Sequence, residues 1–184
     1  MPALAHPDAV IAIRILSALV FMTAAIGKMR SWPIFHGVVA NYRLLPQVLV
    51  APVTYVLPPA EAAIGATLPT GLCAPWAEAA AALLLGVFAV AMGINLWRGR
   101  RQIDCGCFQG TLKQPLSWTL VSRNALLALL LVAAGAAPAG RADAWTAVNG
   151  LLAGGALFVV LQSLNALWAI TAAVRPRIQM GGTS

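Results

Sequence analysis

Hydrophobic residues run through the chain in five long, nearly uninterrupted segments, and short polar stretches separate them. Each segment is close to the ~20 residues that an α-helix needs to cross ~30 Å of hydrocarbon. The pattern therefore predicts five transmembrane helices, at about 9–29, 48–72, 76–97, 118–137 and 145–172. Prolines are frequent between 48 and 72, so we expect this second helix to be kinked or broken.

Tryptophans support these boundaries. All six lie at or near a predicted helix end: Trp32, Trp76, Trp97, Trp118, Trp145 and Trp168. Trp76 and Trp97 are 21 residues apart, and Trp145 and Trp168 are 23 apart. This spacing is typical of rings anchored in the two interfaces of one membrane.

Composition favours the same fold class. Only 9% of the 184 residues are charged and 60% are hydrophobic, whereas soluble domains carry about a quarter charged residues. We therefore expect an all-α integral membrane protein, with residues 1–184 forming one helical-bundle domain. The net charge of +7 does not indicate nucleic-acid binding, because the basic residues flank apolar segments instead of forming one basic face.

The basic residues also predict an orientation. Five spans place the two termini on opposite sides of the membrane. Only Arg14 and Arg141 belong to the side of the N-terminus, and the other ten lie towards the opposite side: Lys28, Arg30, Arg43, Arg98, Arg100, Arg101, Lys113, Arg123, Arg175 and Arg177. The positive-inside rule then predicts a bacterial inner-membrane protein with a periplasmic N-terminus and a cytoplasmic C-terminus.

Two of the three cysteines lie in the polar loop 98–117, as Cys105-Gly106-Cys107. A structural zinc site usually needs four ligands, and three cysteines with two distant histidines supply them poorly, so no metal site is expected. Thiol–disulfide exchange fits better, because Gly106 permits the turn that a small, easily reduced disulfide ring requires. Neighbouring basic residues favour the thiolate, whereas Asp104 opposes it.

Charged residues within the spans are functional candidates, because charge is costly in lipid. Arg14 and Glu61 lie on neighbouring helices at predicted depths that differ by roughly 7 Å, which a long arginine side chain can span. This favours a structural ion pair over a proton-handling role for Glu61. The sequence “GLLAGG” in the fifth segment is interpreted as a helix-packing surface and not as a phosphate-binding loop.

A second set of polar residues lies at similar predicted depths in the membrane, near the ends of the helices on the side of the cysteine loop. It consists of Lys28, Asn95, Arg123, Asn124, Gln162 and Asn165. These side chains either hydrogen-bond helices to one another or form a polar pocket that serves the thiols or the head of a quinone. Depth alone does not distinguish the two interpretations.

Several short motifs occur in the order found in a known family. They are “AIGKM” (Gly27, Lys28), “NYRLLP” (Tyr42, Leu45, Pro46), Glu61 with Gly65, “DCGCF” (Asp104 to Phe108) and “SRN” (Ser122 to Asn124). By these motifs the chain resembles the MauE family of methylamine-utilisation proteins, relatives of the DoxX-like small membrane proteins. The resemblance covers nearly the whole chain, and Cys-Gly-Cys-Phe is its most specific part. One departure is Gln109, which separates Phe108 from Gly110 where many relatives read Cys-Gly-Cys-Phe-Gly.

The resemblance implies a role in maturing methylamine dehydrogenase, whose disulfide-rich small (beta) subunit carries the tryptophan tryptophylquinone cofactor and matures in the periplasm. It also implies a partner, the membrane-anchored thioredoxin-like protein MauD. By this analogy Cys105 and Cys107 would exchange redox equivalents with MauD as a thiol–disulfide oxidoreductase. The rival function is a non-redox assembly or export factor for the same subunit or for MauD.

These two inferences disagree about the membrane side. The charge pattern places the cysteine pair near the cytoplasm, whereas the implied substrate is periplasmic. Electrons could cross the bundle towards Cys73, the loop could fold back into a cavity, or the topology could be inverted. We favour the orientation given by the charges and treat the relay as a hypothesis.

Overall fold

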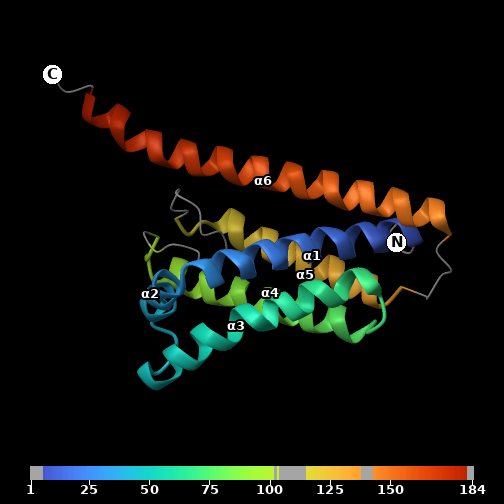
Figure 1. Cartoon of the computed structure of the whole chain (residues 1–184). Coiled ribbons are helices and arrows are strands. Elements are labelled where there is room, and N and C mark those ends of the chain that lie inside the picture. Colours follow the sequence, from blue (N-terminus) through green and yellow to red (C-terminus); the bar gives the residue numbers. More distant parts are fainter. Residues whose placement is uncertain (1–5, 102, 104–114, 138–142, 182–184) are drawn as a thin grey trace.

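The computed structural model describes residues 6–101, 103, 115–137 and 143–181, and the side chains of 169 and 172–181 are not described. Five of its helices are long and apolar enough to span a membrane (Figure 1). They are α1 (Pro7–Arg30), α3 (Gln47–Thr67, prolonged by the 3-10 turn Leu68–Thr70), α4 (Trp76–Trp97), α5 (Trp118–Gly135) and α6 (Ala144–Gly181). The predicted all-α membrane fold with about five spans is confirmed.

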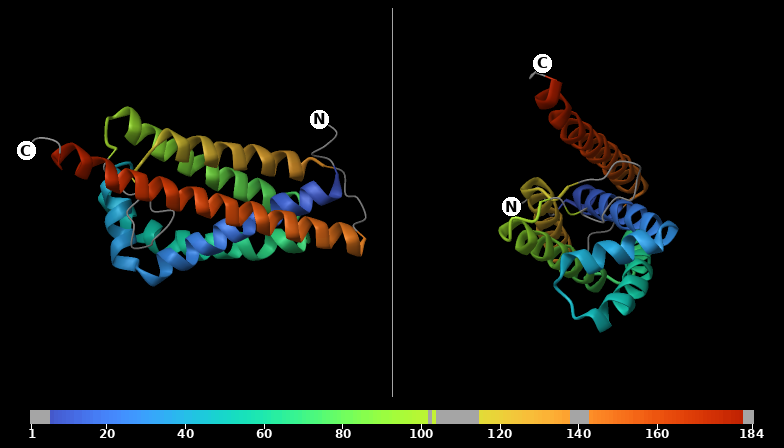
Figure 2. Two further views of the ribbon diagram at one scale, coloured as in Figure 1. Left: turned by 90° about the horizontal axis from the view of Figure 1, so that it is seen from above. Right: turned by 90° about the vertical axis from the view of Figure 1, so that its left-hand side faces the viewer.

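Three boundaries differ from the prediction. The prolines do not break the second span, because α3 continues through Pro52, Pro58 and Pro59. Helices in a bundle can satisfy the backbone groups that proline frees. The last helix, α6, continues to Gly181 instead of ending near 172. An additional helix, α2 (Trp32–Tyr42), lies across the bundle end where α1 ends and α3 begins (Figure 2).

The bundle is built around α1. This helix packs against α3, α5 and α6, and α4 packs along α5. The main core consists of apolar side chains of α1, α4 and α5, including the fully buried Phe21, Ala81 and Leu131. The outermost helix is α6, which packs chiefly against α1 (Figure 2). The buried side of α1 can therefore position charged groups away from lipid.

Glycines allow α6 and α3 to approach α1 closely. A Cβ on Gly154 would lie 2.7 Å from the carbonyl oxygen of Ala12, and one on Gly150 would lie 2.5 Å from Ile11 Cγ2. A Cβ on Gly65 of α3 would lie 3.0 Å from Met22 Cγ. Small residues at such crossings are typical of helix packing in lipid. This geometry agrees with the packing interpretation of “GLLAGG”.

Candidate functional site

A buried ion pair lies where α1 and α3 cross. Lys28, in the last turn of α1, donates a hydrogen bond from Nζ to Oε1 of Glu61 on α3. Both side chains are almost completely buried, at 3% and 1% exposure. A charge in this position is tolerated only when its partner is present, because desolvation of an unpaired ion costs several kcal/mol. The pair is therefore the electrostatic centre of the candidate site.

The predicted pairing of Arg14 with Glu61 is wrong. Arg14 Nε donates instead to Oε1 of Glu78 at 2.6 Å, at the opposite end of the bundle. The depth estimate counted each residue from the end of its own segment. Glu61 lies instead against Lys28, in the last turn of α1. Glu78 lies in the first turn of α4 and is only 1% exposed. Its carboxylate, and not that of Glu61, is therefore the partner of Arg14.

Two residues of α5 lie beside the Lys28–Glu61 ion pair. Arg123 and Asn124 line a small cavity together with Lys28 and Glu61. Its volume is about 20 Å³, which is enough for one water molecule. Lys28, Glu61, Arg123 and Asn124 are therefore brought together, as the polar-pocket interpretation requires. We call these four residues the Lys28 cluster.

Arg123 connects this cluster to α6. Its Nη1 donates to Asn165 Oδ1 at 3.1 Å and its Nη2 donates to Asn124 Oδ1 at 3.3 Å. Asn165 Nδ2 in turn donates to Gln162 Oε1 at 3.3 Å. The Arg123–Asn165 bond joins α5 to α6, as the interhelical interpretation expects, whereas the Asn165–Gln162 bond lies within α6. Arg123 therefore both joins two helices and lines the small cavity.

Asn95 belongs to a different place. It is fully buried, and its Oδ1 accepts a hydrogen bond from Arg100 Nη1 at 3.1 Å. Arg100 also donates to the carbonyl oxygen of Tyr42 at 3.4 Å, which ties the chain after α4 to the end of α2. Asn95 therefore holds the start of loop 98–117 and does not join the Lys28 cluster.

The base of the cysteine loop is fixed against the bundle. The Leu116 N–H donates to the Ile103 carbonyl oxygen at 3.1 Å. Leu116 belongs to a buried apolar cluster with Met92, Leu96 and Leu120, and Ile103 packs against it. The two ends of the loop are thus adjacent. The predicted site residues Asp104, Cys105, Gly106 and Cys107 lie outside the described residues.

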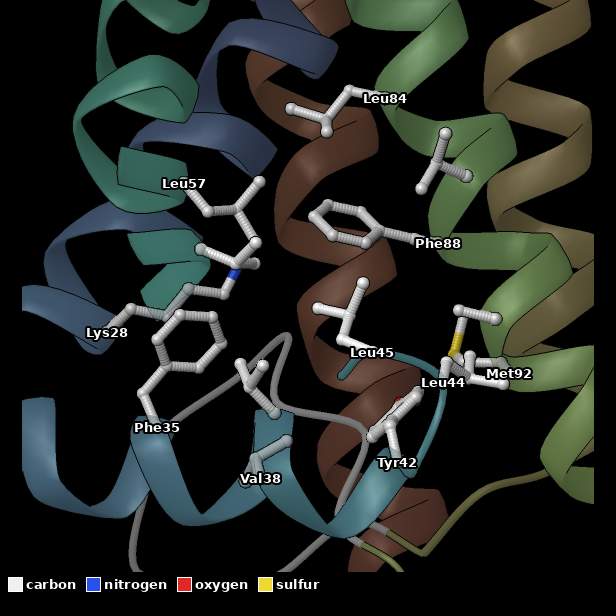
Figure 3. A pocket seen from close by; sticks show the side chains of 14 residues that line it. Lys28, Phe35, Val38, Tyr42, Leu44, Leu45, Leu57, Leu84, Phe88 and Met92 are labelled. Atoms are coloured by element: carbon white, nitrogen blue, oxygen red, sulfur yellow. The ribbon is translucent and has the colours of Figure 1, made fainter. Parts of the chain in front are cut away.

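A larger cavity of about 330 Å³ lies beside the Lys28 cluster, between α1, α2, α3 and α4. Figure 3 shows the Lys28 side chain reaching into it near the rings of Phe35 and Phe88. The Lys28 ammonium lies 5.4 Å from the centroid of Phe35 and 4.9 Å from that of Phe88. These distances are within the range of cation–π contacts.

This cavity was not predicted from the sequence, because α2, which lines it, was not predicted. Phe35, Val38 and Tyr42 line it from that helix and recur at positions i, i+3 and i+7. This spacing marks one apolar face of a helix and could have revealed α2. The segment is too short to span a membrane, so a search for long apolar runs passes over it.

No group of three or more His, Cys, Asp or Glu side chains that could hold a metal ion is found within the described ranges. The one cysteine described, Cys73, is exposed between the 3-10 turn and α4, at the opposite end from the loop 98–117. The polar chemistry of the described bundle is therefore concentrated in the Lys28 cluster and in the Arg14–Glu78 pair.

Comparison with known proteins identifies the family. The family described as “Methylamine utilisation protein MauE” matches residues 7–137, which include α1 to α5. The chain belongs to the MauE family. The match contains the whole Lys28 cluster and the Cys-Gly-Cys motif, and it ends before α6 begins.

Curated MauE proteins resemble the chain over most of its length. “Methylamine utilization protein MauE” of Paracoccus denitrificans is 46% identical over 173 residues, which cover 92% of each chain. The protein of the same name from Paracoccus versutus is 45% identical over 88% of each chain. That of Methylorubrum extorquens is 43% identical over 70% of this chain and 69% of its own. No solved structure matches the chain.

Proposed function

We propose that this chain acts in methylamine utilisation, as a membrane thiol–disulfide component in the maturation of the methylamine dehydrogenase small (beta) subunit. Its MauE relatives support the coarser role through their names. The observation that carries the finer role is the Cys105-Gly106-Cys107 motif, in a loop whose two ends are fixed together at Ile103 and Leu116. The described ends of the loop lie at one end of the bundle, where a partner could reach it.

The proposed reaction is an exchange with a thioredoxin-like, membrane-anchored partner of the MauD type. The thiolate of one cysteine of the pair attacks the partner's disulfide and forms a mixed disulfide. The second cysteine then displaces the partner's sulfur. One disulfide forms and one breaks, so electrons and protons balance, and the same steps run in reverse when the partner is the reductant.

Local charge supports the reactivity of these thiols. Arg98, Arg100 and Arg101 begin the loop, and Lys113 lies near its end. Positive charge lowers the pKa of a neighbouring cysteine and raises its thiolate fraction, which is the attacking species. Asp104 acts in the opposite direction, and its neutralisation is expected to increase the thiolate fraction.

Direct exchange between this pair and Cys73 does not fit the geometry. Cys73 precedes α4, and the 22 residues of that helix span about 33 Å. Cys107 is four residues beyond Ile103, which is packed at the far end of α4, and four extended residues reach only about 14 Å. A relay across the membrane would therefore need a separate carrier.

A double Cys105→Ser, Cys107→Ser variant tests the proposed function. We expect it to reach the membrane at normal levels but to lose at least about 90% of active methylamine dehydrogenase, because exchange requires both thiols. A Cys73→Ser variant is the matched control and should retain full activity, because this cysteine is exposed at the other end. Accumulation of active dehydrogenase in the double variant would favour the non-redox assembly or export role.

The single Cys105→Ser and Cys107→Ser variants extend this test. Removal of the resolving thiol should trap a mixed disulfide with the thioredoxin-like partner, visible on non-reducing gels. Only one of the two variants should accumulate it, which identifies the attacking sulfur. Absence of the adduct from both variants would contradict exchange with this partner.

The orientation can be tested with the same cysteines. Arg30, Arg43, Arg98 and Arg101 are exposed at the bundle end that bears the loop, as the positive-inside rule expects for a cytoplasmic surface. In intact spheroplasts, a membrane-impermeant thiol reagent should label Cys73 but not Cys107. Labelling of Cys107 from outside would show that the topology is inverted.

A further inference from the structure

We propose that the 330 Å³ cavity between α1, α2, α3 and α4 is a binding site for a neutral, membrane-soluble quinone. Its volume is within the range of small-molecule sites. Its lining is almost wholly apolar, and Lys28 and Tyr42 are the two polar side chains among the lining residues. The lining residues named here do not include the cysteines, so the proposal does not rest on the thiol chemistry.

The aromatic side chains favour a flat ring as the occupant. Phe35 enters from α2 and Phe88 from α4, with Met92 one turn further along α4 (Figure 3). Aromatic rings prefer offset or edge-to-face contact with another ring, and methionine sulfur also contacts ring edges favourably. A planar ring would therefore gain contacts in this cavity that a flexible acyl chain would not.

The ammonium of Lys28 favours a carbonyl acceptor on that ring. An ammonium carries three N–H donors, and one of those of Lys28 is donated to Glu61 Oε1. The other donors lie towards the cavity and the two phenyl faces. A quinone carbonyl oxygen can accept one of them without displacing Glu61.

The Lys28–Glu61 pair also selects against an anion. Glu61 already balances the charge of Lys28, and both are buried. A carboxylate or phosphate in the cavity would add negative charge beside Glu61 in a region of low dielectric, which is strongly unfavourable. The favoured occupant is therefore neutral, which distinguishes a quinone from a fatty acid.

The cavity is accessible from the apolar part of the surface. Val87, near the middle of α4, is 54% exposed, and Leu45, just before α3, is 38% exposed, and both line the cavity. Val87 lies within the apolar span of α4, so this surface faces the hydrocarbon of the bilayer. A quinone could enter laterally from the lipid and leave its isoprenoid tail there.

Photolabelling of the full chain in nanodiscs tests the site. An azido derivative of a short-chain ubiquinone should label peptides from 35–45 and 84–92, and unlabelled decylubiquinone should displace it. Val38→Trp, which places an indole in the cavity, should reduce this labelling by about tenfold or more. Val132→Trp is the matched control, because Val132 is exposed on α5, and it should label like the native chain.

A second variant keeps the test decisive if Val38→Trp does not fold. The double variant Lys28→Met, Glu61→Met removes the donor without leaving a buried charge. It should bind about tenfold more weakly, because a hydrogen bond from a charged donor is lost. Three results would overturn the proposal. They are labelling spread over the lipid-facing surface, displacement by oleate but not by decylubiquinone, and undiminished binding in both cavity variants. None of these results depends on Cys105 or Cys107, whose substitution should leave binding unchanged.

Discussion

Replacement of Lys28 by methionine is expected to destabilise the folded protein by about 3–5 kcal/mol, because it removes the ammonium that balances the buried carboxylate of Glu61. Glu61 is completely buried, so bulk water does not solvate this carboxylate in place of the lost ammonium. The measurement is the free energy of unfolding in detergent by denaturant titration, together with the amount of protein that accumulates in the membrane. Both quantities should fall strongly.

The matched control is the variant in which both charges are removed. Lys28→Met, Glu61→Met should recover most of the lost stability, because replacing a buried ion pair with apolar side chains of similar volume is often neutral. Arg14→Met provides a second comparison. The side chain of Glu78 is only 2% exposed, so Arg14→Met should also be destabilising, because it removes the guanidinium that balances a buried carboxylate. Equal stability of Lys28→Met and the native chain would contradict a structural role for the ion pair.

Glu61→Gln then separates structure from proton transfer. Glutamine keeps the shape and an acceptor oxygen but cannot ionise. Reduced protein level with normal activity per molecule would support the structural role. Normal protein level with lost activity would show that a titrating carboxyl is required.

The long apolar segments predicted the five spans correctly, because the membrane sets both their length and their composition. The ends of helices were harder to predict. Pro52, Pro58 and Pro59 indicated a kink or a break, and α3 continues through them without a break. The helix α2 was not predicted, because its residues serve to close the end of the bundle and not to cross the membrane.

The Lys28 cluster was predicted only in part, because Lys28, Arg123 and Asn124 were grouped together whereas Glu61 was assigned to Arg14. Lys28, Glu61, Arg123 and Asn124 were selected as polar residues within apolar segments, and they line one cavity. The partner of each residue depends on how the helices are placed against one another and on which side of each helix faces α1. The distance of a residue from the end of its apolar segment gives neither, so Glu61 was assigned to Arg14 instead of Lys28.

Gly154→Val is expected to displace α6 from α1 and to destabilise the bundle by at least about 1–3 kcal/mol, the range for overpacking of a close contact. The added Cβ would lie 2.7 Å from the Ala12 carbonyl oxygen and 2.8 Å from Ile15 Cβ. The first of these atoms belongs to the backbone, which cannot move aside as the end of a flexible side chain can. Unfolding in detergent and protease sensitivity of α6 are the measurements.

The neighbouring glycine provides a matched control. A Cβ on Gly155 has no neighbour within 4 Å, and valine there carries the same intrinsic helix preference as at Gly154. Equal stability of the two variants would show that α6 does not cross α1 at Gly154.

Because Asn165 of α6 accepts a hydrogen bond from Arg123, displacement of α6 should also disturb the Lys28 cluster. Gly154→Val should therefore impair dehydrogenase maturation per folded molecule, whereas Gly155→Val should not. Packing at the α1–α6 crossing thus sets the geometry of the charged site.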